Sequence, residues 1–276
     1  MNKIECNVCH HRCKLNENQI GLCKARSNVN EKIVSINYGE ITSIALDPIE
    51  KKPLRHFHPG SMILSVGSFG CNLKCSFCQN HGISTIGKND IITQYVSPEN
   101  LIKVALDSIP LGNIGIAYTY NEPLIGYEYV RDCAMLAKKN NLKNVVVTNG
   151  CFNEEILNEI LPYIDAFNID LKGFNNEFYK KIGGDLEMVK KFIQKAHKQA
   201  HIEITTLIIP DENDSEEEIK DISEFIAAID NDIPLHISRF FPCYKMTDKK
   251  PTDIKKVYEL AKIARMKLKY VYEGNC

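Results

Sequence analysis

The stretch Met62-Ile63-Leu64-Ser65-Val66 is an apolar run, and it is soon followed by Gly70-Cys71-Asn72-Leu73-Lys74-Cys75-Ser76-Phe77-Cys78. The run predicts a buried strand, and the polar residues between the cysteines predict an exposed loop. Three thiolates at this spacing suit an iron-sulfur cube that keeps one iron free of protein ligands. Zinc fits poorly because structural zinc sites take four protein ligands, and three small buried hydrophobes would not explain a polar loop. We therefore predict a 4Fe-4S cluster on Cys71, Cys75 and Cys78.

Composition limits the class of protein. The chain has 276 residues, 44% of them hydrophobic, which is enough for one large core with a small appendage. Its formal net charge of -1 gives no basic field, so a nucleic-acid substrate is not indicated. Eleven cysteines, without a signal peptide or an apolar run of membrane length, predict a cytoplasmic protein with no membrane segment.

The first 55 residues form a cysteine-rich segment with few large apolar side chains. It contains four cysteines, namely Cys6, Cys9, Cys13 and Cys23. So short a segment cannot bury enough surface to fold alone, and closed zinc sites contribute on the order of 10 kcal/mol or more. We predict a four-cysteine zinc knuckle, with a second iron-sulfur cluster as the alternative, because thiolates alone do not choose between these metals. His10 or His11 could replace a cysteine as a ligand, but we expect both to be solvated loop side chains.

Residues 56–276 alternate short apolar runs with longer amphipathic stretches, which predicts a second and larger domain. Strands are expected at 62–66, 114–118, 144–148, 165–170, 202–208 and 234–238, and Tyr270-Val271-Tyr272 can add a last one. Ser97 before Pro98 predicts a helix start, and Ser215 with Glu218 predicts a capping box. Repeated strand-helix units predict an α/β fold with a parallel sheet. Periodicity alone does not exclude a doubly wound sheet.

Mostly polar residues gather where the expected strands end, together with one proline, and this is where reactive groups lie in parallel α/β folds. They are Tyr120, Asn121, Glu122, Pro123, Thr148, Asn149, Asp170 and Lys172, with His236 on the last strand. Alternation puts Asp170 and Lys172 on the same face, where an unpaired buried charge would be costly. The alternative for these two is a purely structural ion pair.

Cys71, Cys75 and Cys78, with Phe77 before the third cysteine, resemble the signature of the radical S-adenosylmethionine (SAM) superfamily. Further similar stretches are Asp47 to Leu54, His56 to Gly60, Ala117 to Pro123, Asn168 to Lys172 and His236 to Pro242. Together they resemble the radical SAM member of the AmmeMemoRadiSam system, a group similar to pyruvate formate-lyase activating enzyme. The resemblance covers nearly the whole chain and implies a partial (β/α)6 barrel preceded by the small metal-binding segment.

The resemblance also implies which residues contact SAM, whose amino and carboxylate groups chelate the open iron in this superfamily. They are Phe77, Asn121, Glu122, Pro123, Thr148, Asn149, Asp170, Lys172 and His236. Tyr120 and Asn121 replace the glycines of the family's Gly-Gly-Glu-Pro-type motif, which grips the SAM amino group. At this motif the resemblance therefore depends on Glu122 more than on the backbone contacts of the glycines. Activating enzymes have an aspartate before Thr-Asn-Gly, and Val147 replaces it, which puts a monovalent-cation site in doubt.

Candidates on the substrate side are Arg239, Tyr120, Cys151, Cys243 and Cys276. Each of the three cysteines follows an expected strand, so we predict that they converge at the barrel mouth. The alternative is three small buried residues. Cys133 lies in a helical run and is expected to be a core residue.

The resemblance implies an enzyme that reductively cleaves SAM to methionine and a 5'-deoxyadenosyl radical, which takes hydrogen from an unidentified substrate. A one-electron donor protein would supply the electron, and Memo-type and AMMECR-type proteins are implied partners. The alternatives are a glycyl-radical-enzyme activase and a non-catalytic metal-stapled scaffold.

Overall fold

The computed structural model describes residues 3–276, and its centre is one eight-stranded sheet of order β14-β13-β12-β11-β10-β9-β7-β6. The strands are β6 (Ser43–Pro48), β7 (Met62–Gly67), β9 (Asn113–Tyr118), β10 (Lys143–Thr148), β11 (Ala166–Asp170), β12 (His201–Ile208), β13 (Leu235–Arg239) and β14 (Val271–Gly274). Neighbours from β7 to β14 run parallel, and β6 pairs with β7 antiparallel. The predicted α/β fold, with its mostly parallel sheet of the partial-barrel type, is confirmed.

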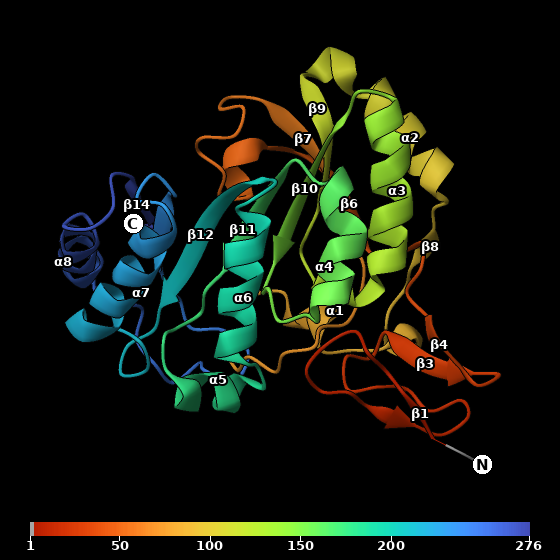
Figure 1. Cartoon of the computed structure of the whole chain (residues 1–276), viewed down its shortest axis with the longest axis horizontal. Helices are drawn as coiled ribbons and strands as arrows, with labels where there is room; N and C mark the ends of the chain where they lie inside the picture. The colour runs from red at the N-terminus through yellow and green to blue at the C-terminus, as the bar shows by residue number, and fades with distance from the viewer. Residues whose placement is uncertain (1–2) are drawn as a thin grey trace.

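Helices cover the outer face of this sheet. They are α2 (Pro98–Asp107), α3 (Tyr127–Lys139), α4 (Glu154–Ile160), α6 (Leu186–Ala196), α7 (Glu216–Ile229) and α8 (Ile254–Ala264), whereas the short helices α1 (His81–Ser84) and α5 (Asn176–Ile182) lie at the lower end of the sheet in Figure 1. Figure 1 shows α3, α4 and α6 in front of the strands. None of the helices within residues 3–276 is both long and apolar enough to cross a bilayer.

Two of the predicted caps form, one of them incompletely. The Ser97 side chain accepts a hydrogen bond from the Asn100 N–H at the start of α2. The Ser215 side chain likewise accepts from the Glu218 N–H at the start of α7. The Glu218 carboxylate does not return to Ser215, because it accepts instead from the Phe174 N–H. The capping box is therefore only half formed, and Glu218 ties α7 to the loop before α5.

The inner face of the sheet has a small apolar core of its own. Ala117, Val145 and Ala166 occupy paired positions on β9, β10 and β11, so their side chains share one face. Ile49 and Leu54 pack against them. Both come from residues 49–57, which we call the strap. The strap follows β6 and fills the floor of the partial barrel.

The N-terminal segment contains only short strands. The hairpin strands are β1 (Ile4–Glu5) with β2 (Lys14–Leu15) and β3 (Arg26–Val29) with β4 (Lys32–Ser35), and β5 (Glu40–Ile41) pairs with β8 (Gln94–Tyr95). In Figure 1 the red and orange hairpins lie at the lower right, at the end of the sheet toward which the β10 arrow points. The segment is therefore close to the carboxyl ends of the strands. A boundary at residue 55 stays a prediction, and β6, which precedes it, belongs to the main sheet.

Candidate active site

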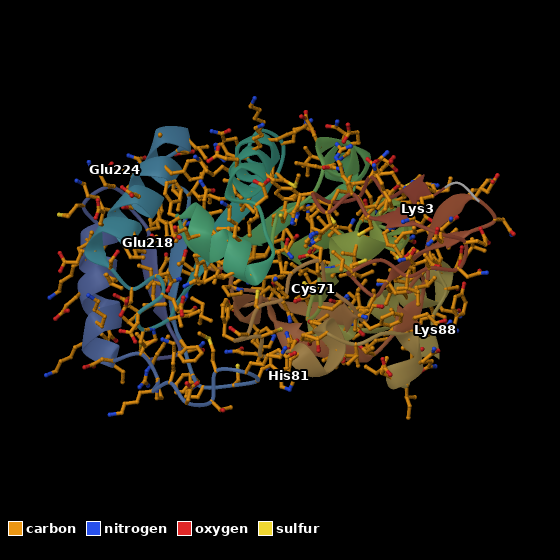
Figure 2. The ribbon with its side chains drawn as sticks, turned by 90° about the horizontal axis from the view of Figure 1, so that it is seen from below. Lys3, Cys71, His81, Lys88, Glu218 and Glu224 are labelled. Atoms are coloured by element: carbon orange, nitrogen blue, oxygen red, sulfur yellow. The ribbon has the colours of Figure 1, made fainter. Side chains whose placement is uncertain are left out.

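The cluster loop, residues 69–78, leaves β7 at its carboxyl end. Figure 2 views the molecule from below Figure 1 and shows Cys71 near the middle, between the N-terminal segment and the C-terminal helices. Gly70 has a φ of +87°, and a Cβ there would come within 2.4 Å of the Cys23 carbonyl oxygen, so only glycine fits. Cys75 is buried, whereas Cys71 and Cys78 are half-buried.

The surroundings of the three thiols suit a thiolate-bound metal centre. Burial raises the pKa of Cys71 far above its ordinary value, and the nearby Glu122 carboxylate adds to this rise. Burial also raises the pKa of Cys75 to about 11. A bound metal would favour the deprotonated sulfurs, and the Leu73 N–H already donates to Cys71 Sγ at 3.3 Å. Each thiolate of such a cluster binds a different iron. Within residues 3–276, no three His, Cys, Asp or Glu side chains are placed so that they could hold a single metal ion.

Glu122 is the buried carboxylate next to this loop. It caps the 3-10 helix η4 (Pro123–Gly126) by accepting from the Leu124 N–H at 3.1 Å. It also accepts from Thr148 Oγ1 and from the Asn149 N–H, both at 2.8 Å. Burial raises the pKa of Glu122 to about 7, although these hydrogen bonds lower it in part. A cation arriving at this carboxylate would favour its ionised form.

The two residues before Glu122 have different partners. The Asn121 side chain donates to the carbonyls of Phe69 and Gly70 at 3.1 Å each and therefore holds the start of the cluster loop. Tyr120 has a φ of +72°, and its hydroxyl donates to Asp47 Oδ2 at 2.6 Å. A SAM contact by Asn121 stays a prediction.

Asp170 and Lys172 form an ion pair beside the cluster loop, with 3.0 Å between Lys172 Nζ and Asp170 Oδ2. Burial alone would lower the pKa of Lys172, but Asp170 and the neighbouring thiols of Cys75 and Cys78 raise it above its ordinary value. The sequence predicted that both side chains share a face. The structure adds that the Lys172 charge lowers the pKa of the Cys75 thiol, in opposition to burial.

His236 is fixed by Glu203, a residue that the motif analysis missed. His236 Nε2 lies 2.6 Å from Glu203 Oε2, and both side chains are buried. The same carboxylate accepts from the backbone N–H groups of Arg55 and His56 in the strap. A lone glutamate in the apolar run His201 to Ile204 was the available signal, because a charge inside a strand needs partners.

Phe77, Pro123 and Arg239 lie at the rim of this arrangement. Phe77 is buried, and its ring stacks on Phe178 of α5 with 6.1 Å between centroids. Pro123 is the first residue of η4 and is buried. Arg239 Nε donates to the Thr252 carbonyl at 2.7 Å, so this guanidinium is partly engaged in holding the chain after β13.

The three cysteines expected to converge at the barrel mouth have separate neighbours, and Cys243 is the one whose thiol lies beside the cluster loop. Cys151 Sγ lies 3.0 Å from His10 Nδ1 and is fully buried. Cys243 Sγ instead donates to the Phe77 carbonyl at 3.2 Å, and Cys276 is exposed near the C-terminus. Position after a strand does not fix the direction of a side chain, and the turn that follows each strand differs. Cys133 is a buried residue of α3, as predicted.

His10 and His11 are not simply solvated, which corrects the expectation for them. His10 Nε2 lies 3.0 Å from the Gly183 carbonyl oxygen, and His11 Nε2 lies 2.8 Å from that of Asn72. Both histidines therefore connect the N-terminal segment to the barrel.

The four N-terminal cysteines surround one small cavity. Its lining includes Cys6, Cys9, Cys13 and Cys23 together with Arg26. Burial raises the pKa of Cys9 to about 12 and raises that of Cys23 as well. The Nε atom of Arg26 is buried without a hydrogen-bond partner in the described residues, although its other nitrogens bind Glu128. A group of anionic thiolates in the cavity would fit this cation.

The family follows from a comparison with known proteins. The family model described as the radical SAM superfamily matches residues 65–226, which is more than half of the chain and includes the cluster loop. The chain belongs to the radical SAM superfamily. Membership implies a 4Fe-4S cluster and SAM, and the thiols of the cluster loop fit that cluster.

Radical SAM relatives of this chain include characterised and uncharacterised proteins. Uncharacterized protein MJ0808 of Methanocaldococcus jannaschii is 40% identical, with 99% of this chain and 82% of the relative covered. Pyruvate formate-lyase 1-activating enzyme of Escherichia coli (strain K12) is 23% identical, with 59% and 67% covered. The crystal structure of Streptococcus suis SuiB bound to S-adenosylmethionine has a TM-score of 0.59 at 14% identity, with 75% and 48% covered. That last likeness shows the fold alone.

Proposed function

We propose that this radical SAM protein reductively cleaves SAM at a 4Fe-4S cluster held by Cys71, Cys75 and Cys78. The observation that carries the proposal is the placement of Glu122 and Lys172 beside one three-thiol loop. When bound, the cluster and SAM supply the chemistry: one electron yields methionine and a 5'-deoxyadenosyl radical, which takes a hydrogen atom from the substrate. A one-electron donor protein would provide that electron.

The protein's own residues would position SAM and exclude water. Glu122 is surrounded by N–H and O–H donors, and it can pair with the SAM ammonium group once ionised. Lys172 is a charged donor next to the thiols and suits the SAM carboxylate, while Asp170 suits the ribose hydroxyls. Glu203 holds the His236 ring in one orientation, so His236 would act as a preset contact.

The proposal is tested with anaerobically reconstituted protein, SAM and dithionite. We expect methionine and 5'-deoxyadenosine in equal amounts, and neither from a variant with Cys71, Cys75 and Cys78 changed to Ala. Cys276→Ala, which removes an exposed cysteine, is the matched control and should keep the activity. A protein that holds no cluster, or whose cluster leaves SAM intact, would be the non-catalytic scaffold instead.

We further propose that the chain is the radical SAM member of the AmmeMemoRadiSam system and works with Memo-type and AMMECR-type proteins. The support is the sequence resemblance of the stretches from Asp47 to Leu54 and from His56 to Gly60, which overlap the strap. Affinity purification from the native host should recover one of these partners. Recovery of neither would remove the support for the pathway but not for SAM cleavage.

A second candidate function is activation of a glycyl radical enzyme. The likeness to pyruvate formate-lyase 1-activating enzyme favours it. In that case the substrate is a backbone glycine of a partner protein. An electron paramagnetic resonance signal from a glycyl radical in such a partner would decide for activation.

At the N-terminal cysteines we propose zinc, with a second iron-sulfur cluster as the alternative. Support comes from the shared cavity and the unpartnered Arg26 nitrogen. No three ligating side chains within residues 3–276 yet surround a single ion, so a zinc ion would have to draw the thiols inward.

A further inference from the structure

The cysteine segment, residues 4–23, lies directly against the cluster loop. The Cys71 N–H donates to the Cys23 carbonyl at 3.1 Å, so one cysteine of each site shares a backbone hydrogen bond. The fit is close, because a Cβ on Gly70 would come within 2.4 Å of that same carbonyl oxygen. A movement of the Cys23 backbone would therefore shift the Cys71 backbone directly, because the two share this hydrogen bond.

Two histidines of the cysteine segment make further connections. His11 Nε2 donates to the Asn72 carbonyl at 2.8 Å, inside the cluster loop. Asn72 Oδ1 accepts from Asn149 Nδ2 at 2.8 Å, and this amide nitrogen lies 3.8 Å from Cys71 Sγ. His10 contacts Cys151 Sγ, just past β10. The segment thus supports the cluster loop and its neighbouring loop together.

The cysteine segment has little of its own to keep this shape. Its strands β1 and β2 have two residues each, and the following β3 and β4 have four each. Isolated two-stranded hairpins of this length are marginal in water. The four cysteines and Arg26 line one cavity, and Arg26 Nε is buried without a hydrogen-bond partner in the described residues, so a metal bound there would supply the missing stability.

We propose that a thiolate-bound metal at Cys6, Cys9, Cys13 and Cys23 holds the cluster loop in its ligating shape. The cysteine segment is then a positioning element for the active site, and its metal must be in place before the 4Fe-4S cluster is held firmly. This inference rests on the proposed function, because that proposal identifies the cluster loop as the site of the 4Fe-4S cluster. Zinc and an iron-sulfur cluster share the required thiolate chemistry.

The first test needs neither cluster nor SAM. Full-length Cys75→Ala/Cys78→Ala protein keeps the Cys71 amide but cannot hold the active-site cluster. It is labelled with 15N-cysteine and offered zinc, or ferrous iron with sulfide, in separate samples. We expect one of the two to bind and to slow hydrogen exchange of the Cys71 amide about tenfold, because that amide is bonded to Cys23.

The matched control adds Cys9→Ser, which should abolish both metal binding and the slowing, whereas Cys276→Ser should change neither. Zinc as the effective metal identifies a knuckle, and iron with sulfide identifies a second cluster. Binding of neither metal, or binding without slower exchange at Cys71, overturns the proposal. Failure of SAM cleavage would not affect this test, so the two proposals fail separately.

A second test uses the reconstituted protein and leaves all four cysteines of the N-terminal site intact. His11→Ala removes the donor to Asn72, and we expect the SAM-responsive cluster signal to disappear about fivefold faster under a chelator, the scale of one hydrogen bond. His11→Gln keeps an N–H donor and should restore much of the lifetime. Equal lifetimes for the unmodified protein and His11→Ala would refute the connection through His11.

Discussion

Glu203→Gln tests how strongly one buried carboxylate holds the strap to the barrel. Glu203 is fully buried and accepts from the backbone N–H groups of Arg55 and His56 at 2.9 and 2.8 Å. Two imidazoles, from His201 and His236, donate to it at 3.0 and 2.6 Å. Burial would raise the pKa of Glu203, but these hydrogen bonds outweigh it and lower the pKa from 4.5 to about 2.

The pKa of Glu203 falls from 4.5 in the unfolded chain to about 2 in the folded protein. At about 1.4 kcal/mol for each pKa unit, this difference amounts to about 3 kcal/mol of folding free energy. A glutamine keeps one acceptor oxygen and turns an NH₂ group toward other donors. We therefore expect Glu203→Gln to lower the free energy of unfolding at pH 7 by about 3 kcal/mol. Urea unfolding measures this, and Glu155→Gln on the exposed side of α4 is the control.

The pH dependence has a definite sign. Because the folded pKa lies below the unfolded one, the contribution of Glu203 is complete above pH 4.5 and is lost as the pH falls from 4.5 toward 2. The difference in the free energy of unfolding between Glu203→Gln and the unmodified protein should therefore decrease as the pH falls from 4.5 toward 2. A variant within about 0.5 kcal/mol of the unmodified protein at pH 7 would refute the reasoning, since exposed substitutions have effects of that size.

Three other predictions concern the cofactor sites. Changing Cys71, Cys75 and Cys78 to Ala should abolish the broad visible absorbance of the reconstituted protein together with SAM cleavage, because no other thiols in the chain have the triplet spacing; colour and cleavage that both survive would contradict it. The same triple variant should contain about one zinc per chain by elemental analysis, whereas residual iron would indicate a second cluster and no metal would exclude both. Asp170→Asn and Lys172→Ala should each weaken SAM binding by about 1 to 3 kcal/mol with unchanged iron content, and unchanged affinity in a calorimetric titration would make the pair structural.

The sheet was largely predictable because most of its strands carry continuous apolar runs. β6 was missed, and its side chains explain why. Ile44 is 42% exposed on the outside, whereas the inward position of Asp47 is 8% exposed. The apolar and polar positions are thus reversed relative to the usual pattern of an edge strand. Lys52 and Tyr120 compensate the Asp47 charge; Lys52 is five residues away in sequence, whereas Tyr120 is 73 residues away and lies outside any local window around β6.

The site was predictable only where a motif fixes the local geometry. The cluster loop and the Asp170–Lys172 pair depend on short-range spacing, and alternation along β11 was sufficient for the pair. The contacts of His10 and His11 span 173 and 61 residues, so no sequence window contains both partners. Cys151 follows Gly150, whose φ of +67° turns the chain toward the N-terminal segment.

The strap has a consequence for the order of assembly during synthesis. Its bonds to Glu203 span 148 and 147 residues, and the contact between His56 Nε2 and Tyr272 spans 216. Contacts this distant in sequence form late, because the chain between them must first be ordered. A nascent chain that has emerged only as far as β11 therefore has its cluster loop but no anchored barrel floor. At that stage Ile49 and Leu54 already have their apolar partners on β9, β10 and β11, but the strap lacks the bonds to Glu203 and Tyr272 that anchor it until β12 and β14 emerge.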